Sequence, residues 1–209
     1  MNDRGKPMNI KRNFWIILVL LFNLLTGCRS APQRDFSDRD LLIDEQAMPE
    51  NWEFLESAAS KELFRVGELS GARISFQAKN SPYYIVRGGE DIYRYSSSFR
   101  AAWRYKAISK SHLTPNIAGE VWSKPDEIEF VSPWADRQVI VCQERESKLW
   151  GEFSGYRNVC EYLAQYDEFL ISFIITTSVE GQQYITMDEV EKIIEEVDQK
   201  VGAYLNPNP

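Results

Sequence analysis

Two segments of the chain carry apolar residues at intervals of three and four, the spacing of an amphipathic helix. In the segment 97–110, Phe99 and Trp103 flank the apolar stripe, and the opposite face is basic. The segment 186–205 opens with Thr186 and Glu189, the pair that forms a capping box. Its apolar face contains Val190, Ile193, Ile194, Val197, Val201, Tyr204 and Leu205. We therefore predict two main helices, at 97–110 and 186–205.

Alternation of apolar and polar residues predicts the strands. In the stretch 72–78, Ile74 and Phe76 alternate with Arg73 and Ser75, which is the pattern of a half-buried strand. Further strands are predicted at 52–56, 83–86, 127–131, 137–144, 158–165 and 168–177, and a brief helix at 40–46. The glycine pair at 88–89 indicates a bulge or a tight turn. The pattern as a whole predicts a single α+β domain, an antiparallel sheet packed by the two helices.

The most hydrophobic stretch, from Phe14 to Leu25, lies in an N-terminal leader. The 13 residues before it have a net charge of +3. A positive segment followed by an apolar run is typical of a secretory signal peptide. The run contains 12 residues, whereas a bilayer-spanning helix needs about 20 apolar residues. We therefore predict a signal peptide over residues 1–27, with either Met1 or Met8 as the start.

The end of this run, Leu25-Thr26-Gly27-Cys28, resembles the lipobox of bacterial lipoproteins, in which small residues precede a cysteine. The resemblance implies that Cys28 accepts the lipid and that the leader is cut before it. The body is then held at the outer face of the plasma membrane, since several acyl chains anchor a domain stably. Arg29 points to the outer membrane if the cell has two membranes. An ordinary signal peptide with a cysteine near its end is the alternative.

Removal of residues 1–27 leaves 182 residues with 20 basic and 30 acidic side chains, a net charge of −10. This charge argues against nucleic acid as a partner, because its binding relies on a surplus of Lys and Arg. It also argues against a basic patch that grips anionic lipid. The polar segment 28–39 is predicted to be a flexible tether. The remaining length suits one globular domain at 40–205, followed by a tail at 206–209.

Cys142 and Cys160 remain as a pair once Cys28 is assigned to lipid. In an oxidising compartment such a pair is expected to form a disulfide. A metal site is the alternative, but no CxxC spacing is present and the single histidine, His112, is distant in sequence. We therefore predict a Cys142–Cys160 disulfide, no metal site and no cofactor, with His112 at the surface.

The order of elements over residues 136–205 also resembles a known class of exported domain. Two cysteine-bearing strands, an apolar strand and a closing amphipathic helix are similar to bacterial sensor-type domains. These include the extracytoplasmic domains of mycobacterial membrane Ser/Thr kinases and related small lipoproteins of uncharacterised role. The resemblance rests on Cys142, Cys160 and the helix pattern. It implies a role in binding a ligand or a partner rather than catalysis, although a fold alone does not establish function.

Three tryptophans are candidates for ligand binding. Trp122, Trp134 and Trp150 fall in or beside predicted loops, where exposed rings are suited to stacking on sugars or peptides. Packing of the same rings on the core is the alternative. We expect a non-enzymatic, lipid-anchored protein that binds a small ligand, a glycan or an envelope protein.

Two other function classes remain open. The sequence has a single histidine and no GxSxG motif, so it contains no signature of nucleophilic catalysis. A cell-envelope hydrolase that uses carboxylates such as Asp126, Glu127 and Glu129 is the second hypothesis. A structural subunit of an envelope complex is the third.

Overall fold

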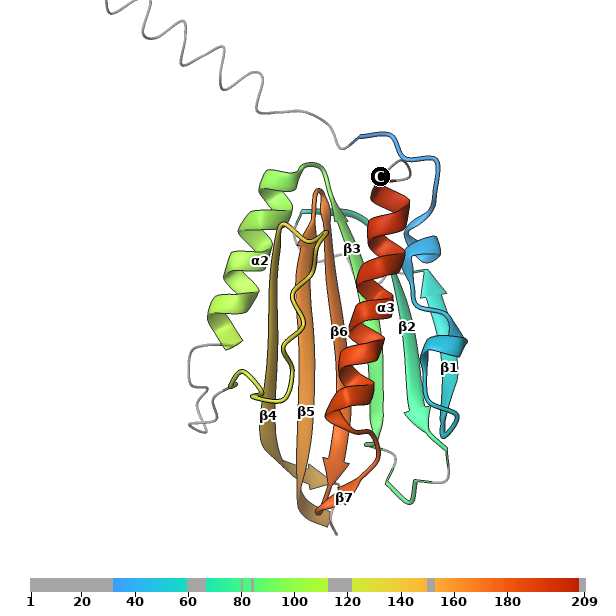
Figure 1. The fold of residues 1–209 in the computed structure, drawn as a ribbon, viewed down its shortest axis with the longest axis vertical. Helices are drawn as coiled ribbons and strands as arrows, with labels where there is room; N and C mark the ends of the chain where they lie inside the picture. The colour runs from blue at the N-terminus through green and yellow to red at the C-terminus, as the bar shows by residue number, and fades with distance from the viewer. Residues whose placement is uncertain are drawn as a thin grey trace, which may run out of the picture.

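A computed structural model of the protein describes residues 32–59, 67–79, 81–83, 85–112, 122–149 and 153–206. The predicted leader, Cys28 and Trp150 lie outside these residues. The described residues form one antiparallel sheet with helices packed on it (Figure 1). The prediction of an α+β fold with an antiparallel sheet is therefore confirmed.

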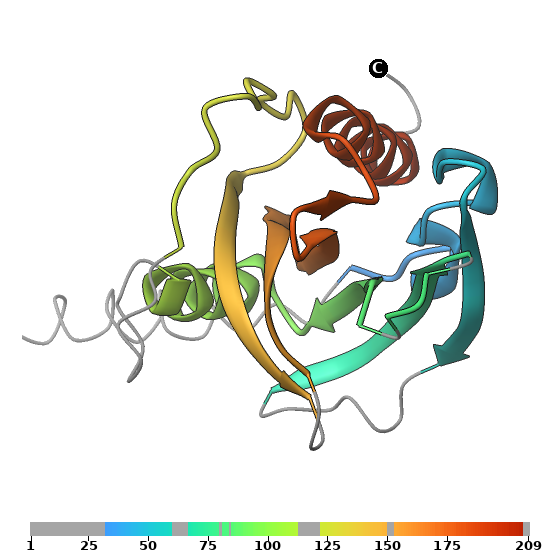
Figure 2. The ribbon, with the colours of Figure 1, turned by 90° about the horizontal axis from the view of Figure 1, so that it is seen from below.

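The sheet of the described residues has seven strands. In chain order the elements are η1 (Asp38–Leu41), η2 (Glu45–Ala47), β1 (Trp52–Ala59), β2 (Glu68–Ala78), β3 (Arg87–Tyr95), α2 (Ser98–His112), β4 (Arg137–Leu149), β5 (Phe153–Tyr166), β6 (Phe169–Val179), β7 (Gln182–Gln183) and α3 (Met187–Leu205). The strand order is β1-β2-β3-β6-β5-β4, with β7 beside β6. Seen from below, the sheet curves around α3, while α2 lies on its opposite face (Figure 2).

The face of the sheet that α3 covers holds the largest apolar core. The rings of Phe76 and Phe173 stack there with centroids 5.6 Å apart, and Trp52 contacts Phe76 edge-on. The capping box also forms: the N–H of Glu189 donates to Thr186 Oγ1 at 3.2 Å, and the N–H of Thr186 donates to Glu189 Oε2 at 2.8 Å. The apolar face of α3 is buried over Val190, Ile193, Ile194, Val197 and Val201. The predicted C-terminal helix is therefore confirmed.

The other main helix, α2, covers only part of the opposite face. Ala101 is buried against Leu163 and Leu170 of the sheet, as the predicted apolar stripe requires. Phe99 and Trp103 remain 77% and 65% exposed. Among the described residues, no helix combines the length and the apolarity that crossing a membrane requires.

The N-terminal segment packs against the body. Arg34 donates from Nε and Nη2 to the two carboxylate oxygens of Glu168, at 2.9 and 2.8 Å. Phe36 lies against the rings of Phe169 and Tyr204. Residues 34–36, which the sequence placed in a flexible tether, are therefore held on the domain. The described chain begins at the end of the sheet that carries the β5–β6 turn (Figure 1).

The strand predicted to begin at 83–86 begins instead at Arg87, as β3, Arg87–Tyr95. β3 contains Gly88 and Gly89, which were predicted to form a bulge or turn. A Cβ on Gly88 would lie 2.1 Å from Cε2 of Phe76. The missing side chain of Gly88 therefore lets Phe76 pack closely against the sheet, and the glycine does not form a turn.

The strand predicted at 127–131 is also wrong. The backbone N–H groups of Glu129 and Phe130 donate to Oε1 of Glu191, at 3.1 and 2.8 Å. A side chain of α3 thus takes the place of a neighbouring strand. The brief helix predicted at 40–46 is replaced by η1 and η2.

A buried polar network ties α3 to this irregular segment. The hydroxyl of Tyr166 donates to Asp198 Oδ1 at 2.7 Å, and the hydroxyl of Ser132 donates to the same oxygen. Ser132 Oγ accepts in turn from the N–H of Trp134 at 3.0 Å. Burial raises the pKa of Asp198, and the two hydroxyl donors act against that shift. The network fixes where the segment before β4 crosses the sheet.

Glu90 of β3 is a fully buried carboxyl in the main core. Its Oε2 accepts from the N–H of Ile43 at 2.7 Å, whereas Oε1 has no hydrogen-bond partner. Burial raises the pKa of Glu90 to about 8. At neutral pH the folded protein therefore retains a proton that the unfolded chain releases.

Stability should consequently fall as the pH rises from about 4.5 towards 8, because the unfolded state loses the Glu90 proton first. Glu90→Gln keeps the shape and removes this titration. Between pH 5 and pH 9, the free energy of unfolding of Glu90→Gln should gain roughly 3–5 kcal/mol relative to the wild type. Urea unfolding at the two pH values measures the change. The exposed Glu50→Gln variant is the control, and a Glu90→Gln curve parallel to wild type would contradict the assignment.

Candidate functional site

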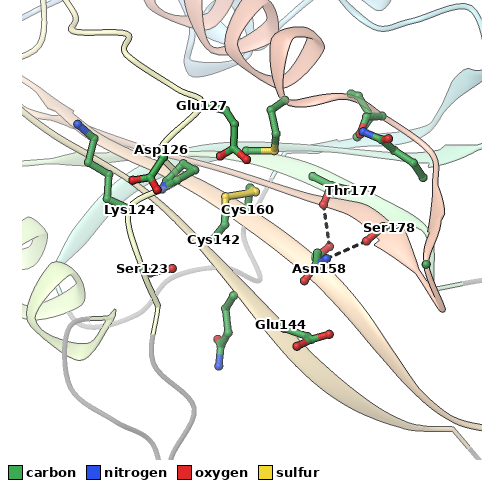
Figure 3. Close-up of a pocket in the computed structure, with 16 residues that line it drawn as sticks. Ser123, Lys124, Asp126, Glu127, Cys142, Glu144, Asn158, Cys160, Thr177 and Ser178 are labelled. Carbon is green, nitrogen blue, oxygen red and sulfur yellow. Dashed lines mark hydrogen bonds between the residues drawn. A yellow bond between two sulfur atoms is a disulfide. The ribbon is translucent and has the colours of Figure 1, made fainter.

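An open pocket of about 640 Å³ lies beside β7 (Figure 3). β7 is at the end of the sheet away from the N-terminal segment (Figure 1). Three parts of the chain form it. The segment 123–127 forms one wall, the β7–α3 turn forms another, and β4, β5 and β6 form the floor. Residues that are distant in sequence therefore meet here because of the sheet register.

The floor of the pocket contains the disulfide. Cys142 and Cys160 lie directly opposite each other on β4 and β5, with Cα atoms 4.0 Å apart, and their sulfurs are bonded. The predicted disulfide is confirmed. Ser123 exchanges two backbone hydrogen bonds with Cys142, of 2.9 and 2.8 Å. The disulfide thus links the edge strand β4 covalently to β5, and the wall segment is hydrogen-bonded to β4 at the same residue.

Hydrogen bonds fix the polar groups beside the disulfide. Asn158 Nδ2 donates to Ser178 Oγ at 3.0 Å, and Thr177 Oγ1 donates to the backbone carbonyl of Asn158 at 3.3 Å. These side chains come from adjacent strands, β5 and β6 (Figure 3). The side-chain amide oxygen of Asn158 and the hydroxyl of Ser178 can form further hydrogen bonds with a ligand.

The charged groups of the pocket are mostly acidic. Asp126, Glu127 and Glu144 line it together with one cation, Lys124. In Figure 3 the carboxylates of Asp126 and Glu127 lie on one side of the disulfide and that of Glu144 on the other. Ionised carboxylates only accept hydrogen bonds, so the lining suits a ligand rich in O–H and N–H donors.

The structure does not bring the described tryptophans into one concavity. Trp122 is 8% exposed and packs against Val141 and Val159, on the sheet face opposite α3. Trp134 lies on the α3 side, where its ring contacts Gly202 so closely that a Cβ there would be 2.5 Å from Cγ. Neither lines the pocket of Figure 3. Trp150 lies outside the described residues.

His112 is buried rather than exposed, so the prediction of a surface position is wrong. Its Nε2 lies 3.2 Å from Oε2 of Glu161, and its ring lies 5.1 Å from that of Trp122. The physical reason is that α2 ends over the sheet, where an acid of β5 is available as a partner.

Of the acids considered for hydrolysis, Asp126 and Glu127 line the pocket and Glu129 does not. Within the described residues, the acids with raised pKa values lie elsewhere: Glu90, Asp167 and Asp198. In the described ranges, no group of three or more His, Cys, Asp and Glu side chains is arranged to hold a metal ion. Comparison of the chain with protein-family models, curated proteins and solved structures found no match.

Sequence reasoning missed Glu144, Asn158 and Ser178. A signal for two of them was present, because an antiparallel pairing of Cys142 with Cys160 also places Glu144 opposite Asn158. Ser178 could not be found this way, since the register shifts between Asn158 and Val159 where β5 meets β6.

Loss of the disulfide should weaken the fold and the pocket wall together. The cysteines are 18 residues apart, a separation for which cross-linking contributes about 3 kcal/mol. In a Cys28→Ala background, Cys142→Ser/Cys160→Ser should lower the free energy of urea unfolding by about this amount. Reductant should shift the midpoint of the parent and leave that of the double variant unchanged. Equal midpoints for the oxidised parent and the double variant would show that the bond does not stabilise the fold.

Proposed function

We propose that the protein is a lipid-anchored, extracytoplasmic binding protein whose pocket beside the disulfide holds an amine- and hydroxyl-bearing ligand, such as an amino sugar of an envelope glycan. The observation that carries this proposal is the lining of the pocket. Three carboxylates lie around amide and hydroxyl groups: Asp126, Glu127 and Glu144 with Asn158, Ser123, Ser178 and Gln183. Acceptors in this density favour a polyhydroxylated ligand that carries positive charge.

The position of the pocket agrees with a tethered binding protein. Pro32 and Arg34 lie at the end of the sheet with the β5–β6 turn, because Arg34 is bound to Asp167 and Glu168 of that turn. Cys28 precedes Pro32 by four residues, a reach of at most about 14 Å. The pocket lies at the other end of the strands, beside β7. A lipid on Cys28 would therefore leave the pocket facing away from the membrane.

The charge of the body supports the same ligand class. A net charge of −10 on residues 28–209 adds to the local field of the acidic pocket, which attracts cationic ligands and repels anionic ones. The neighbouring Asp126 and Glu127 also support the hydrolase hypothesis, because carboxylate pairs carry out glycoside hydrolysis. A single binding experiment separates the two functions.

A β-1,4-linked glucosamine tetrasaccharide should bind the full chain in detergent, and its N-acetylated form should bind more weakly because it lacks the positive charge. Asp126→Asn/Glu127→Gln should reduce the affinity roughly 10- to 100-fold, the effect expected for lost charge-assisted hydrogen bonds. Isothermal titration calorimetry measures both. Asp188→Asn, on the first turn of α3 outside the pocket, should bind like the wild type.

Cleavage of the tetrasaccharide during the titration would contradict the binding function and support the hydrolase hypothesis. Affinities that are equal for both sugars and for all variants would remove the pocket as the site.

The anchor has its own test. Cys28→Ala should remain unprocessed or should release the body into the soluble fraction, because the lipid acceptor is missing. Membrane fractionation and mass spectrometry of the N-terminus follow the outcome in the native type of host. A variant that is cut and stays membrane-bound like the wild type would overturn the lipoprotein assignment and leave the pocket proposal standing.

A further inference from the structure

A second pocket, of about 370 Å³, lies on the face of the sheet opposite α3, where Val159 and Ile174 of its lining pack with Trp122. Four guanidinium groups line it, those of Arg73, Arg87, Arg145 and Arg157, with one carboxylate, Asp91. Such a concentration of positive charge stands out in a body whose net charge is −10. It belongs to a different site from the acidic pocket and does not depend on it.

One of the four arginines is already neutralised. Arg73 binds Asp91 through two hydrogen bonds, Nε to Oδ1 and Nη2 to Oδ2, the second of 2.8 Å. Arg145 and Arg157, on the adjacent strands β4 and β5, contribute two further positive charges to the lining.

Arg145 and Arg157 form a directly opposed pair in the register of β4 and β5. Like charges at opposed positions destabilise a sheet. Within the described part of the chain, neither residue takes part in an ion pair. The Nε of Arg157 is buried and has no acceptor. Burial, followed by the charge of Arg145, lowers the pKa of Arg157. The repulsion between the two guanidinium groups therefore destabilises the fold, and a bound anion would offset that repulsion.

Neutral groups orient Arg145. Its guanidinium carbon lies 4.8 Å from the centre of the Trp122 ring, and its Nε donates to Gln143 Oε1 at 2.9 Å. A cation over a tryptophan face keeps its full charge, since the ring does not neutralise it. Trp122, a candidate ligand contact by sequence, thus acts here as a positioning residue.

We propose that this pocket is a binding site for a phosphoryl anion, with Arg145 and Arg157 as the principal ligands. Guanidinium groups match the oxygens of a phosphoryl group with paired hydrogen bonds, and a dianion balances two unpaired arginines. Gly89, which has no side chain, lies on the floor of the pocket, and Arg87 extends the cationic lining. The same chemistry occurs on phosphorylated soluble molecules or polymers and on phospholipid headgroups.

Inorganic pyrophosphate at constant ionic strength tests the site on the full chain in nonionic detergent. At a hundred times its Kd, it should raise the unfolding temperature of the wild type by about 5–10 °C. Arg157→Gln and Arg145→Gln should each weaken binding at least tenfold. Without the anion both variants should unfold at or above the wild-type temperature, because the repulsion is gone. If either arginine had a merely structural role, its variant would unfold below the wild-type temperature in the absence of the anion.

Arg100→Gln, an exposed basic position on α2 outside the pocket, is the matched control and should keep the full shift. A short-chain phosphatidylglycerol, dissolved below its critical micelle concentration, distinguishes the sources. Arg157-dependent binding of this lipid would assign the site to headgroups, and binding of pyrophosphate alone would assign it to soluble or polymeric phosphate. No shift in the wild type with either probe, or equal shifts in the wild type and both pocket variants, would overturn the proposal.

Discussion

The register of β4 on β5 is the constraint on which both pockets depend. Cys142 lies opposite Cys160, and the disulfide holds that pairing covalently. Because side chains alternate between the two faces of a strand, the same pairing puts Glu144 and Asn158 on the α3 side and the opposed arginines, 145 and 157, on the other. A slip of β4 by one residue would move Glu144 and Arg145 to the opposite faces of the sheet. The disulfide therefore holds the register that gives each of the two pockets its charge.

The two faces differ because the helices cover them differently. α3 packs a continuous apolar stripe on one face, while α2 covers only part of the other. In the core beneath α3, buried carboxyl groups lie where backbone or hydroxyl groups donate hydrogen bonds to them. Glu90 receives the N–H of Ile43, and Asp198 receives the hydroxyls of Tyr166 and Ser132. The open part of the second face is where unpaired cations remain in contact with solvent.

Much of the fold could be predicted from local pattern. The capping box and the three-and-four spacing located α3 closely, and the alternation at 72–78 lies within β2. Prediction failed where a distant residue decided the local structure. Gly88 belongs to a strand because Phe76 needs the space, and the stretch at 127–131 is irregular because Glu191 satisfies its backbone. Neither partner is visible within a window of local sequence.

The sequence by itself determined the helices and the cysteine pairing, and it predicted the N-terminal leader with its lipid acceptor. Periodicity, composition and a single even pair of cysteines are properties of the chain before it folds. Only the tertiary structure decided which side chains meet. Arg145 and Arg157 carry no special signal in the sequence. They become a site because antiparallel pairing places them opposite each other and, among the described residues, neither forms an ion pair. The acidic pocket likewise exists only where three separate segments are brought together by the sheet.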